Sequence, residues 1–436
     1  MSQHMLLMMK DTPVMRINFD EMIYDVLDDF HLPYQLKGCI RKCEIREGMS
    51  ISEINAATVA RAKNSEAITR FLAQRVLPIT RENAKKIYAL FGFDQAQDDY
   101  SKARIAVVCR AVSLQDNYWL KLENDQVAWK DVDIHQNHLN EVVAQVALHG
   151  TSLTLTGKEA TPELTSFGAY AKAWHREDDG ELYLYKKGNN GSSEARIEVM
   201  VSNLLKKTNV NSLEYTAGES DGDFVSKCKC MTEGDIVMLH AMDFESYCNR
   251  NGLNFMEEVK KIDADLFYKM CIVDYLVANR DRHSMNWGFF YNSETMEIIG
   301  CHQLYDHNNA FDTELMANPD VPYLAVPTVT MREAARIAMQ RTDFHFTEPV
   351  GRDDFITERQ YRYFVNAAKE LGLDLGPKQN QQNVVESGTH NTQRVFGQSS
   401  KESRVMRAAE PDQSLGLCGG DEAPELPKKG TDIESL

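Results

Sequence analysis

The segment from Val273 to Phe290, VDYLVANRDRHSMNWGFF, places a polar cluster between two apolar runs. The first run has the pattern of a buried helix and the second the pattern of a buried strand, so the polar residues form a loop between them. Asp281 and Asn286 lie five residues apart in this loop. Phosphoryl transfer needs a carboxylate near the attacking hydroxyl and oxygen ligands that hold Mg²⁺ against the phosphates. The loop supplies two groups of these types.

A second aspartate follows at the end of a predicted hairpin. The runs WGFFY and MEIIGCHQL are separated by the turn residues NSET, and the second run leads directly into Tyr305 and Asp306. A hairpin is rigid, so it can hold Asp306 in a fixed position relative to the preceding loop. Asp281, Asn286 and Asp306 together match the set that phosphoryl transfer requires.

An upstream hairpin offers a lysine. The hairpin is predicted from two strand-like segments, TSFGAYAKAWH and ELYLYKKG, on either side of the turn REDDG. Gly168 in the first segment lies at a turn where the backbone can approach phosphates. Strand alternation puts Lys186 on a face with leucines, so its ammonium either extends to water or neutralises phosphate inside a cleft. On the next predicted helix, Glu198 can hold this lysine, and Glu194 one turn earlier is the rival.

Two other interpretations use the same residues. The loop can be an ordinary polar connection whose side chains bond to the backbone and carry no chemistry. Alternatively, histidines and an aspartate of this region can form a transition-metal site. Adjacent strand residues point to opposite faces, which argues against convergence of Asp306 and His307. The metal alternative rests on His283, His302, Asp306 and His307.

Two segments resemble the catalytic and metal-binding loops of HipA-like kinases, NRDRHSMNWGFF and LYDHNNAF. The resemblance covers about residues 151–376 and includes four further motifs in the matching order: TSFGAYAKAW, LYLYKKG, EVMVSNLL and SKCKCMTEGD. By this resemblance Asp281 is the catalytic base, Lys186 contacts phosphate and His283 braces the loop. The Mg²⁺ ligands are Asn286 and Asp306. The implied ATP-binding positions lie in the phosphate loop, near Lys186 and in the adenine-facing connector: Thr165, Ser166, Gly168, Lys172, Lys186, Glu198, Lys229, Cys230 and Met231.

The composition limits the partners. The formal net charge of −17 opposes nonspecific binding to nucleic acid or to an anionic membrane. No apolar run approaches the length of a membrane span. The nine cysteines lie mostly in apolar segments, which favours a reducing cytoplasm over a disulfide framework. The resemblance implies a protein substrate and a HipB-like DNA-binding antitoxin as partners.

The expected fold is α+β, with a two-lobed kinase-like core. Residues 1–16 are expected to be a flexible N-terminus, and residues 17–150 a mainly helical module in which ARIAVVCRAVS and YWLKLE are strands. Residues 151–235 form the predicted small lobe and residues 236–376 the helical large lobe. The polar composition of residues 377–436 predicts a disordered tail.

The predicted function is Mg²⁺- and ATP-dependent phosphorylation of serine or threonine hydroxyls, on a protein or on the chain itself. Met285 stands where the family usually has lysine, and the phosphate loop lacks a proline often found there. These departures keep a second hypothesis open, a nucleotide-binding regulatory module without turnover. A small-molecule or lipid kinase is a third, although amphipathic and basic membrane features are missing.

Overall fold

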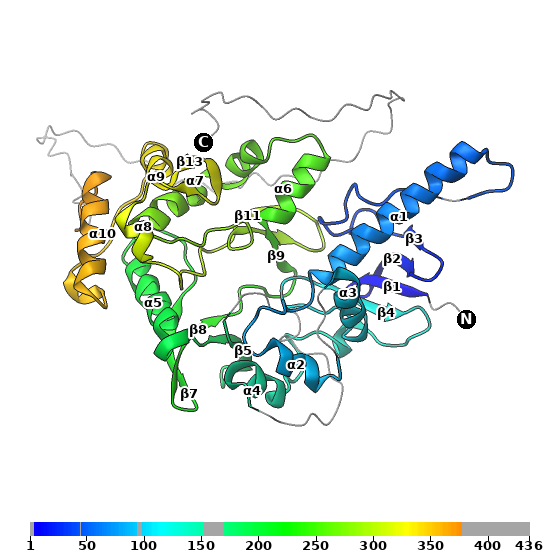
Figure 1. Ribbon diagram of the computed structural model, residues 1–436, viewed down its shortest axis with the longest axis horizontal. Coiled ribbons are helices and arrows are strands. Elements are labelled where there is room, and N and C mark those ends of the chain that lie inside the picture. Colours follow the sequence, from blue (N-terminus) through cyan, green and yellow to red (C-terminus); the bar gives the residue numbers. More distant parts are fainter. Residues whose placement is uncertain (1–3, 44, 94–97, 152–169, 377–436) are drawn as a thin grey trace, which may run out of the picture.

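The computed structural model describes residues 4–43, 45–93, 98–151 and 170–376. These residues form a mixed fold of helices and antiparallel sheets, which confirms the predicted α+β class (Figure 1). Thr165, Ser166 and Gly168 of the expected phosphate loop lie outside the described residues, and so does the expected tail, residues 377–436. None of the described helices is long and apolar enough to span a membrane.

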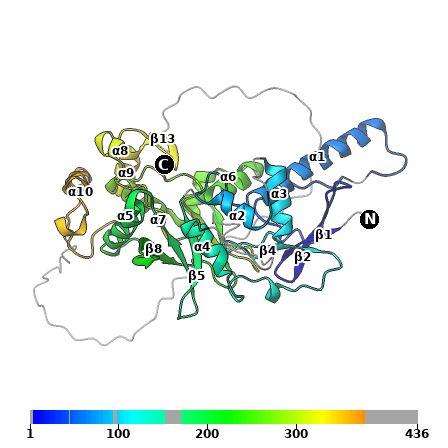
Figure 2. The same cartoon turned by 60° about the horizontal axis from the view of Figure 1, so that its bottom comes forward.

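The N-terminal module combines an antiparallel sheet with four helices. Its sheet has the order β3-β2-β1-β4, with strands β1 (Met5–Met9), β2 (Thr12–Asn18), β3 (Ile23–Val26) and β4 (Tyr118–Leu122). Its helices are α1 (Ile51–Ala73), α2 (Ala84–Leu90), α3 (Asp99–Val108) and α4 (Glu141–His149), and a 3₁₀ turn spans Trp129–Asp131. Both views show α1 projecting away from the body of the molecule (Figures 1 and 2).

Two expectations for this module are wrong. Of the expected flexible N-terminus, residues 4–16 are ordered, because Met5–Met9 is a central strand that pairs with β2 on one side and β4 on the other. The segment ARIAVVCRAVS is not a strand, because its first half lies in α3. Asp98 caps α3 by accepting a hydrogen bond of 2.8 Å from the backbone of Ser101, and the helix packs on α1. Capping and tertiary packing therefore override the β propensity of its valines.

The small-lobe sheet has the order β5-β6-β8-β7 and positions the upstream lysines. Its strands are β5 (Lys172–Arg176), β6 (Leu182–Lys186), β7 (Tyr215–Ser220) and β8 (Asp223–Lys229), and α5 (Asn189–Lys206) packs on β7 and β8. Lys172 lies directly opposite Lys186 in the register of β5 and β6, and Lys186 lies opposite Ser226 of β8. The predicted hairpin around the turn REDDG is present.

The large lobe is built around the buried helix α7 (Phe255–Leu276) and the sheet β11-β10-β9. The strands are β9 (Ile236–His240), β10 (Gly288–Asn292) and β11 (Ile298–Cys301), and a short hairpin joins β12 (Pro322–Tyr323) to β13 (Val326–Thr330). The other helices are α6 (Ala241–Arg250), α8 (Thr313–Ala317), α9 (Met331–Met339) and α10 (Glu358–Glu370), and a 3₁₀ turn spans Arg352–Asp354. The largest apolar core joins α5, α7, α9 and α10 to this sheet.

The N-terminal module shares its apolar cores with the small-lobe sheet. Ala173 of β5 and Val225 of β8 are buried in the cluster formed by β1, β2 and the module's helices. Leu182 of β6 is buried in a second cluster with Trp119 of β4. Burial of strand residues on both faces of the small-lobe sheet therefore depends on residues that precede position 150.

Candidate active site

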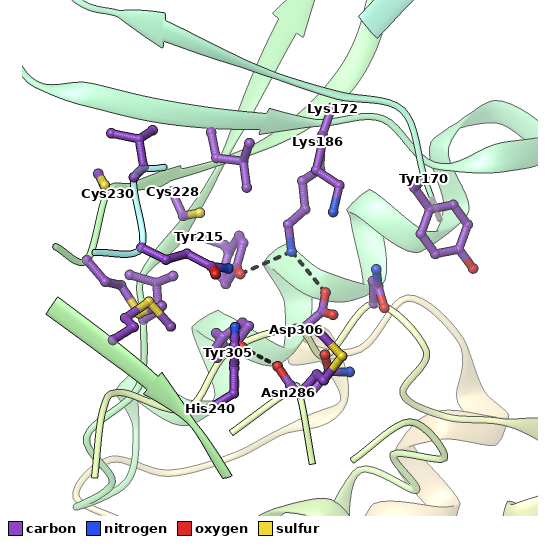
Figure 3. A pocket seen from close by; sticks show the side chains of 18 of the residues that line it. Tyr170, Lys172, Lys186, Tyr215, Cys228, Cys230, His240, Asn286, Tyr305 and Asp306 are labelled. Carbon is purple, nitrogen blue, oxygen red and sulfur yellow. Dashed lines mark hydrogen bonds and ion pairs between the residues drawn. The ribbon is translucent and has the colours of Figure 1, made fainter. Parts of the chain in front are cut away.

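A cavity of about 510 Å³ lies between the small-lobe sheet and two loops of the large lobe. One part of its wall is apolar and includes Leu114, Leu184, Leu213, Met231 and Met238. Another part is polar and charged and includes Lys172, Lys186, Asp281, Asn286 and Asp306. Figure 3 shows labelled residues of both kinds around this space. The wall thus pairs a surface suited to an aromatic ring with one suited to phosphates and cations.

Lys186 lies at the centre of a buried charge network. Its Nζ donates hydrogen bonds of 2.8 Å to Glu198 Oε1, 2.9 Å to Asp306 Oδ1 and 3.2 Å to the Tyr215 hydroxyl. Ser226 Oγ donates to the other carboxylate oxygen of Glu198 at 2.6 Å. Figure 3 shows the lysine reaching from the sheet toward Asp306. The structure therefore selects Glu198 over Glu194 as the helix partner of Lys186.

The electrostatics of this network follow from burial and pairing. Burial alone would lower the pKa of Lys186, but the charges of Asp306 and Glu198 outweigh it and raise that pKa well above its usual range. Burial alone would raise the pKa of Asp306, but Lys186 and Lys172 hold it below its usual range. Burial raises the pKa of Glu198 despite the opposing charge of Lys186. Asp306 is thus an ionised carboxylate, as a cation ligand must be.

Lys172 contributes a second ammonium to the same wall. Burial and then the positive charge of Lys186, its neighbour across the strands, lower the pKa of Lys172 to about 7. An anion placed in this part of the cavity would favour the charged form of Lys172 and raise that pKa. The side chain is therefore adapted to respond to a bound anionic group.

The loop after α7, which the resemblance predicts to be the catalytic loop, presents Asp281 in the wall of the cavity. Asn309 Nδ2 donates a hydrogen bond of 2.9 Å to Asp281 Oδ2, and Asn286 Nδ2 donates one of 2.7 Å to the backbone oxygen of Asp281. The Asp281 side chain remains 39% exposed, so a substrate hydroxyl can reach it. His283 Nε2 lies 3.8 Å from Asp281 Oδ1, and His283 Nδ1 accepts a hydrogen bond from the Met285 backbone at 3.2 Å. The bracing role of His283 stays a prediction.

A buried arginine that the sequence analysis did not single out organises the loop. Arg282 Nε donates to Asp274 Oδ2 of α7 at 3.0 Å, and both side chains are fully buried. The Arg282 guanidinium also donates to the backbone oxygens of Asn286 at 2.6 Å and Tyr305 at 2.8 Å. It thereby ties the catalytic loop to the segment that carries Asp306. The charged pair Asp274 and Arg282, eight residues apart across an apolar helix end, was the available signal.

The segment around Asp306 has a strained backbone and a dedicated support. Asp306 has φ of +61°, in the left-handed region that non-glycine residues rarely adopt. The Tyr305 hydroxyl donates a hydrogen bond of 2.7 Å to the Met285 backbone oxygen, so this segment is fixed to the catalytic loop at a second point. Strain of this kind is retained where the surrounding structure fixes the conformation, and it is common at functional sites.

The transition-metal alternative has no geometric support. Across residues 4–43, 45–93, 98–151 and 170–376, no group of three or more His, Cys, Asp or Glu side chains is arranged to hold a metal ion. His307 Nε2 lies 2.9 Å from the Arg282 guanidinium instead. Burial lowers the pKa of His302 and of His307 to about 3, so both are neutral core histidines.

Lys229 at the end of β8 and Cys230 and Met231 of the following connector all line the cavity. The N-terminal module unexpectedly holds this connector and the strand β9 that follows it. Thr232 Oγ1 donates to the Leu114 backbone oxygen at 2.5 Å, and the Met238 backbone N–H donates to the Gln115 backbone oxygen at 2.8 Å. No local sequence signal marks these contacts, because the partners are more than a hundred residues apart.

The predicted site residues that the structure describes therefore converge. Glu198 does not line the cavity but accepts a hydrogen bond from Lys186, which does. The others all line one cavity: Lys172, Lys186, Lys229, Cys230, Met231, Asp281, His283, Asn286 and Asp306. Their individual roles stay predictions. Arg282, Asn309 and the module residues Leu114 and Gln115 are the participants that the sequence analysis missed.

Residues 169–326 match a family model described as HipA-like kinase. Among solved structures, the Helicobacter pylori proinflammatory kinase CtkA is similar with 15% identity and a TM-score of 0.34, over 46% of this chain and 89% of that chain. A second similar structure is HipA in the Shewanella oneidensis MR-1 toxin–antitoxin complex with HipB and operator DNA. It has 10% identity and a TM-score of 0.39, and the match covers 70% of this chain and 86% of that chain. No curated protein matches. The family match confirms the resemblance to HipA-like kinases that the loop motifs indicate.

Proposed function

We propose that this chain is a HipA-like protein kinase that uses ATP and Mg²⁺ to phosphorylate serine or threonine hydroxyls, on a protein substrate or on itself. The observation that carries the proposal is the network of Lys186, Glu198 and Asp306 beside Asp281 and Asn286 in one cavity. A lysine held by a helix glutamate and two oxygen ligands beside a carboxylate is the arrangement that phosphoryl transfer uses.

The cavity fits a nucleotide in size and in lining. Its volume of about 510 Å³ lies within the range typical of small-molecule sites. The apolar wall suits a purine ring, and Lys172 and Lys186 supply positive charge for phosphates. The connector residues Lys229, Cys230 and Met231 would face the ring.

The residues expected to hold Mg²⁺ have suitable donor atoms. Asp306 is held ionised, and Asn286 uses its Nδ2 on the Asp281 backbone, which leaves its Oδ1 as the remaining donor atom. Mg²⁺ binds oxygen ligands from one or two protein side chains together with phosphates. The ion, when bound, would neutralise charge on the transferring phosphate.

Asp281 is the proposed base. Asn309 fixes one of its carboxylate oxygens and leaves the other accessible, so the carboxylate can orient an acceptor hydroxyl and take its proton. Tyr170 donates a hydrogen bond of 3.0 Å to Asn309 Oδ1 and so fixes the asparagine in turn. Arg282 keeps the loop that carries Asp281 in register with the segment that carries Asp306.

Replacing Asp281 with Asn tests the proposal. With wild type, label from the γ-phosphate of ATP should appear on the chain or on added protein in the presence of Mg²⁺. Asp281→Asn should lower transfer by about 10²- to 10⁴-fold, because the proton acceptor is lost, while nucleotide affinity measured by calorimetry stays close to wild type. Asp178→Asn, exposed in the turn after β5, is the matched control and should be fully active. Equal transfer by Asp281→Asn and wild type would remove Asp281 from this role.

A nucleotide-binding module without turnover is the second candidate. Met285 favours it, because this side chain lines the cavity where the family usually has lysine. The same assay separates the two, since the module would bind Mg²⁺-ATP and transfer no phosphate to any acceptor. A HipB-like DNA-binding partner is also a proposal from the resemblance, and co-purification of a DNA-binding protein with this chain would test it.

A further inference from the structure

A second cavity, of about 830 Å³, adjoins the first. Its wall includes the first half of α5, the catalytic loop and the segment from Asn308 to Leu324. Asp281, Asn308 and Asn309 line both cavities. A group that enters through the second cavity therefore reaches the same carboxylate that faces the first, as the acceptor in a phosphoryl transfer must.

The second cavity has an excess of negative charge. Its wall includes four carboxylates, those of Glu194, Asp281, Asp312 and Glu314. The exposed Arg280 pairs with two of them, at 3.5 Å from Asp312 and 2.8 Å from Glu314. The other arginine in the wall, Arg282, is neutralised by Asp274 in the core. Among the residues that the structure describes, one accessible positive charge thus faces four negative ones, and a cationic ligand would be attracted.

Glu194 is the carboxylate in this wall that the kinase network leaves available. Glu198, one turn further along α5, takes Lys186, and Glu194 accepts a hydrogen bond of 2.8 Å from Ser193. In the part of the chain that the structure describes, no lysine or arginine forms an ion pair with Glu194. Burial and then the charges of Glu194, Asp281 and Asp306 raise the pKa of Tyr170, so these carboxylates act on the same region.

Asn308 supplies an independent indication of a ligand. Its side chain is only 7% exposed, and its Oδ1 is buried without a hydrogen-bond partner among the described residues. Buried side-chain oxygens are rarely left unpaired, so this atom calls for a donor from a bound molecule or water. A peptide N–H, an ammonium or a guanidinium can each donate to it.

We propose that the second cavity is the acceptor groove and that Glu194 selects a lysine or arginine close to the serine or threonine that is phosphorylated. The inference rests on the proposed kinase function and names its substrate class, a peptide segment with a basic residue beside the acceptor hydroxyl. Asp312 and Glu314 add to the attraction for a basic residue, and Arg280, which pairs with both, offsets part of it. Glu194 acts on substrate choice, whereas Asp281 acts on the acceptor proton.

Phosphorylation of a set of serine peptides by the full chain tests this groove. The peptides differ only in one residue, lysine, glutamine or glutamate, placed at each position from three before to three after the serine. Wild type should prefer lysine over glutamine at one or two positions, and Glu194→Gln should reduce that preference about three- to tenfold through KM, as expected for loss of one ion pair. Glu194→Lys should shift the preference toward glutamate. Added salt should weaken the preference of wild type.

Glu245→Gln is the matched control, because Glu245 is exposed on α6 and lines neither cavity. It should keep the lysine preference of wild type. Equal kcat/KM for lysine, glutamine and glutamate peptides, with autophosphorylation intact, would overturn the inference and leave the kinase proposal standing. A Glu194→Gln variant with altered Mg²⁺ dependence and unaltered peptide preference would overturn it as well, since the cation would then be a metal. Absence of transfer to peptide, protein and chain alike would overturn both proposals.

Discussion

At the scale of single residues, Lys186 neutralises two carboxylates that could not otherwise be ionised side by side. Glu198 and Asp306 both approach its ammonium within 3 Å, and the Glu198 side chain has no exposure to solvent. Lys186→Met should lower the free energy of unfolding at pH 7 by about 3 kcal/mol, because it leaves uncompensated buried charge. It should also abolish phosphate transfer. Denaturant unfolding and the labelled-ATP assay measure the two effects.

The pH dependence of that variant follows from the two carboxyl groups. In wild type, the lowered pKa of Asp306 contributes stability above the unfolded pKa near 3.8, and this stability is lost as pH falls through the folded pKa. The raised pKa of Glu198 costs stability as pH rises above its unfolded value near 4.5. Without Lys186 both folded pKa values should rise, so the difference from wild type should shrink as pH falls toward 4. Lys187→Met, which breaks a partly exposed pair with Asp223, should cost under about 1 kcal/mol at every pH.

The sequence identifies the residues of this site that follow one another at short spacing. Asp281, Asn286 and Asp306 are separated by one loop and one hairpin, and local patterns suffice to predict both. Asn308 and Asn309 come directly after the same hairpin, but a polar pair there has no distinctive spacing. The choice between Glu194 and Glu198 depends on how α5 is oriented about its axis when it packs on β8. The periodicity of a single helix does not determine this orientation.

At the scale of elements, the catalytic loop depends on the end of α7. Asp274 on the last turn of α7 holds Arg282, and it also accepts hydrogen bonds of 2.9 Å from Asn279 Nδ2 and 2.6 Å from the Tyr323 hydroxyl. Ala278, with φ of +46°, turns the chain from the helix into the loop. The loop is therefore anchored to the large-lobe core and not to the solvent-facing surface.

Removing Arg282 should disconnect this anchor. Arg282→Ala should lower the free energy of unfolding by about 3–5 kcal/mol, because Asp274 would remain charged and buried and the Asn286 and Tyr305 oxygens would lose their donor. Transfer activity should fall together with stability. Arg362→Ala on α10, where the arginine is 75% exposed in a pair with Glu358, is the control and should cost under about 1 kcal/mol. Urea unfolding measures the free energy of unfolding of both variants. A loss of under about 1 kcal/mol for Arg282→Ala, similar to that of the control, would contradict the anchoring role.

Elements with strong local periodicity are predictable, and those specified by distant partners are not. The hairpin β5-β6 and helices α7 and α10 have clear patterns in the sequence, and the structure contains them. The strand β1 was missed because a run of five apolar residues has no period, and its partner β4 lies over a hundred residues away. The helix α3 was mistaken for a strand because it contains β-branched residues, and its packing against α1 is a contact that local propensity does not include.

At the scale of the whole molecule, the N-terminal module and the kinase part share apolar cores, so we expect them to unfold as one unit. The module buries Ala173, Leu182 and Val225 of the small-lobe sheet, and its Tyr34 hydroxyl donates 2.7 Å to the Met296 backbone oxygen of the large lobe. It also bonds to the connector through Leu114 and to β9 through Gln115. A domain boundary at residue 150, as the sequence suggests, therefore does not separate two independent cores.

Leu7→Ala tests this unity, because Leu7 is only 1% exposed on the central strand β1, far in sequence from the candidate active site. The substitution should lower the free energy of unfolding by about 2–5 kcal/mol through lost burial and a residual cavity. Because the cores are shared, calorimetry should show one transition at a lower temperature, and nucleotide binding should disappear at that same temperature. Leu122→Ala, a leucine of the same sheet that is 37% exposed, should change the transition little. A transition for the module alone, with nucleotide binding retained up to the wild-type temperature, would show instead that the kinase part folds independently and that the module is an accessory.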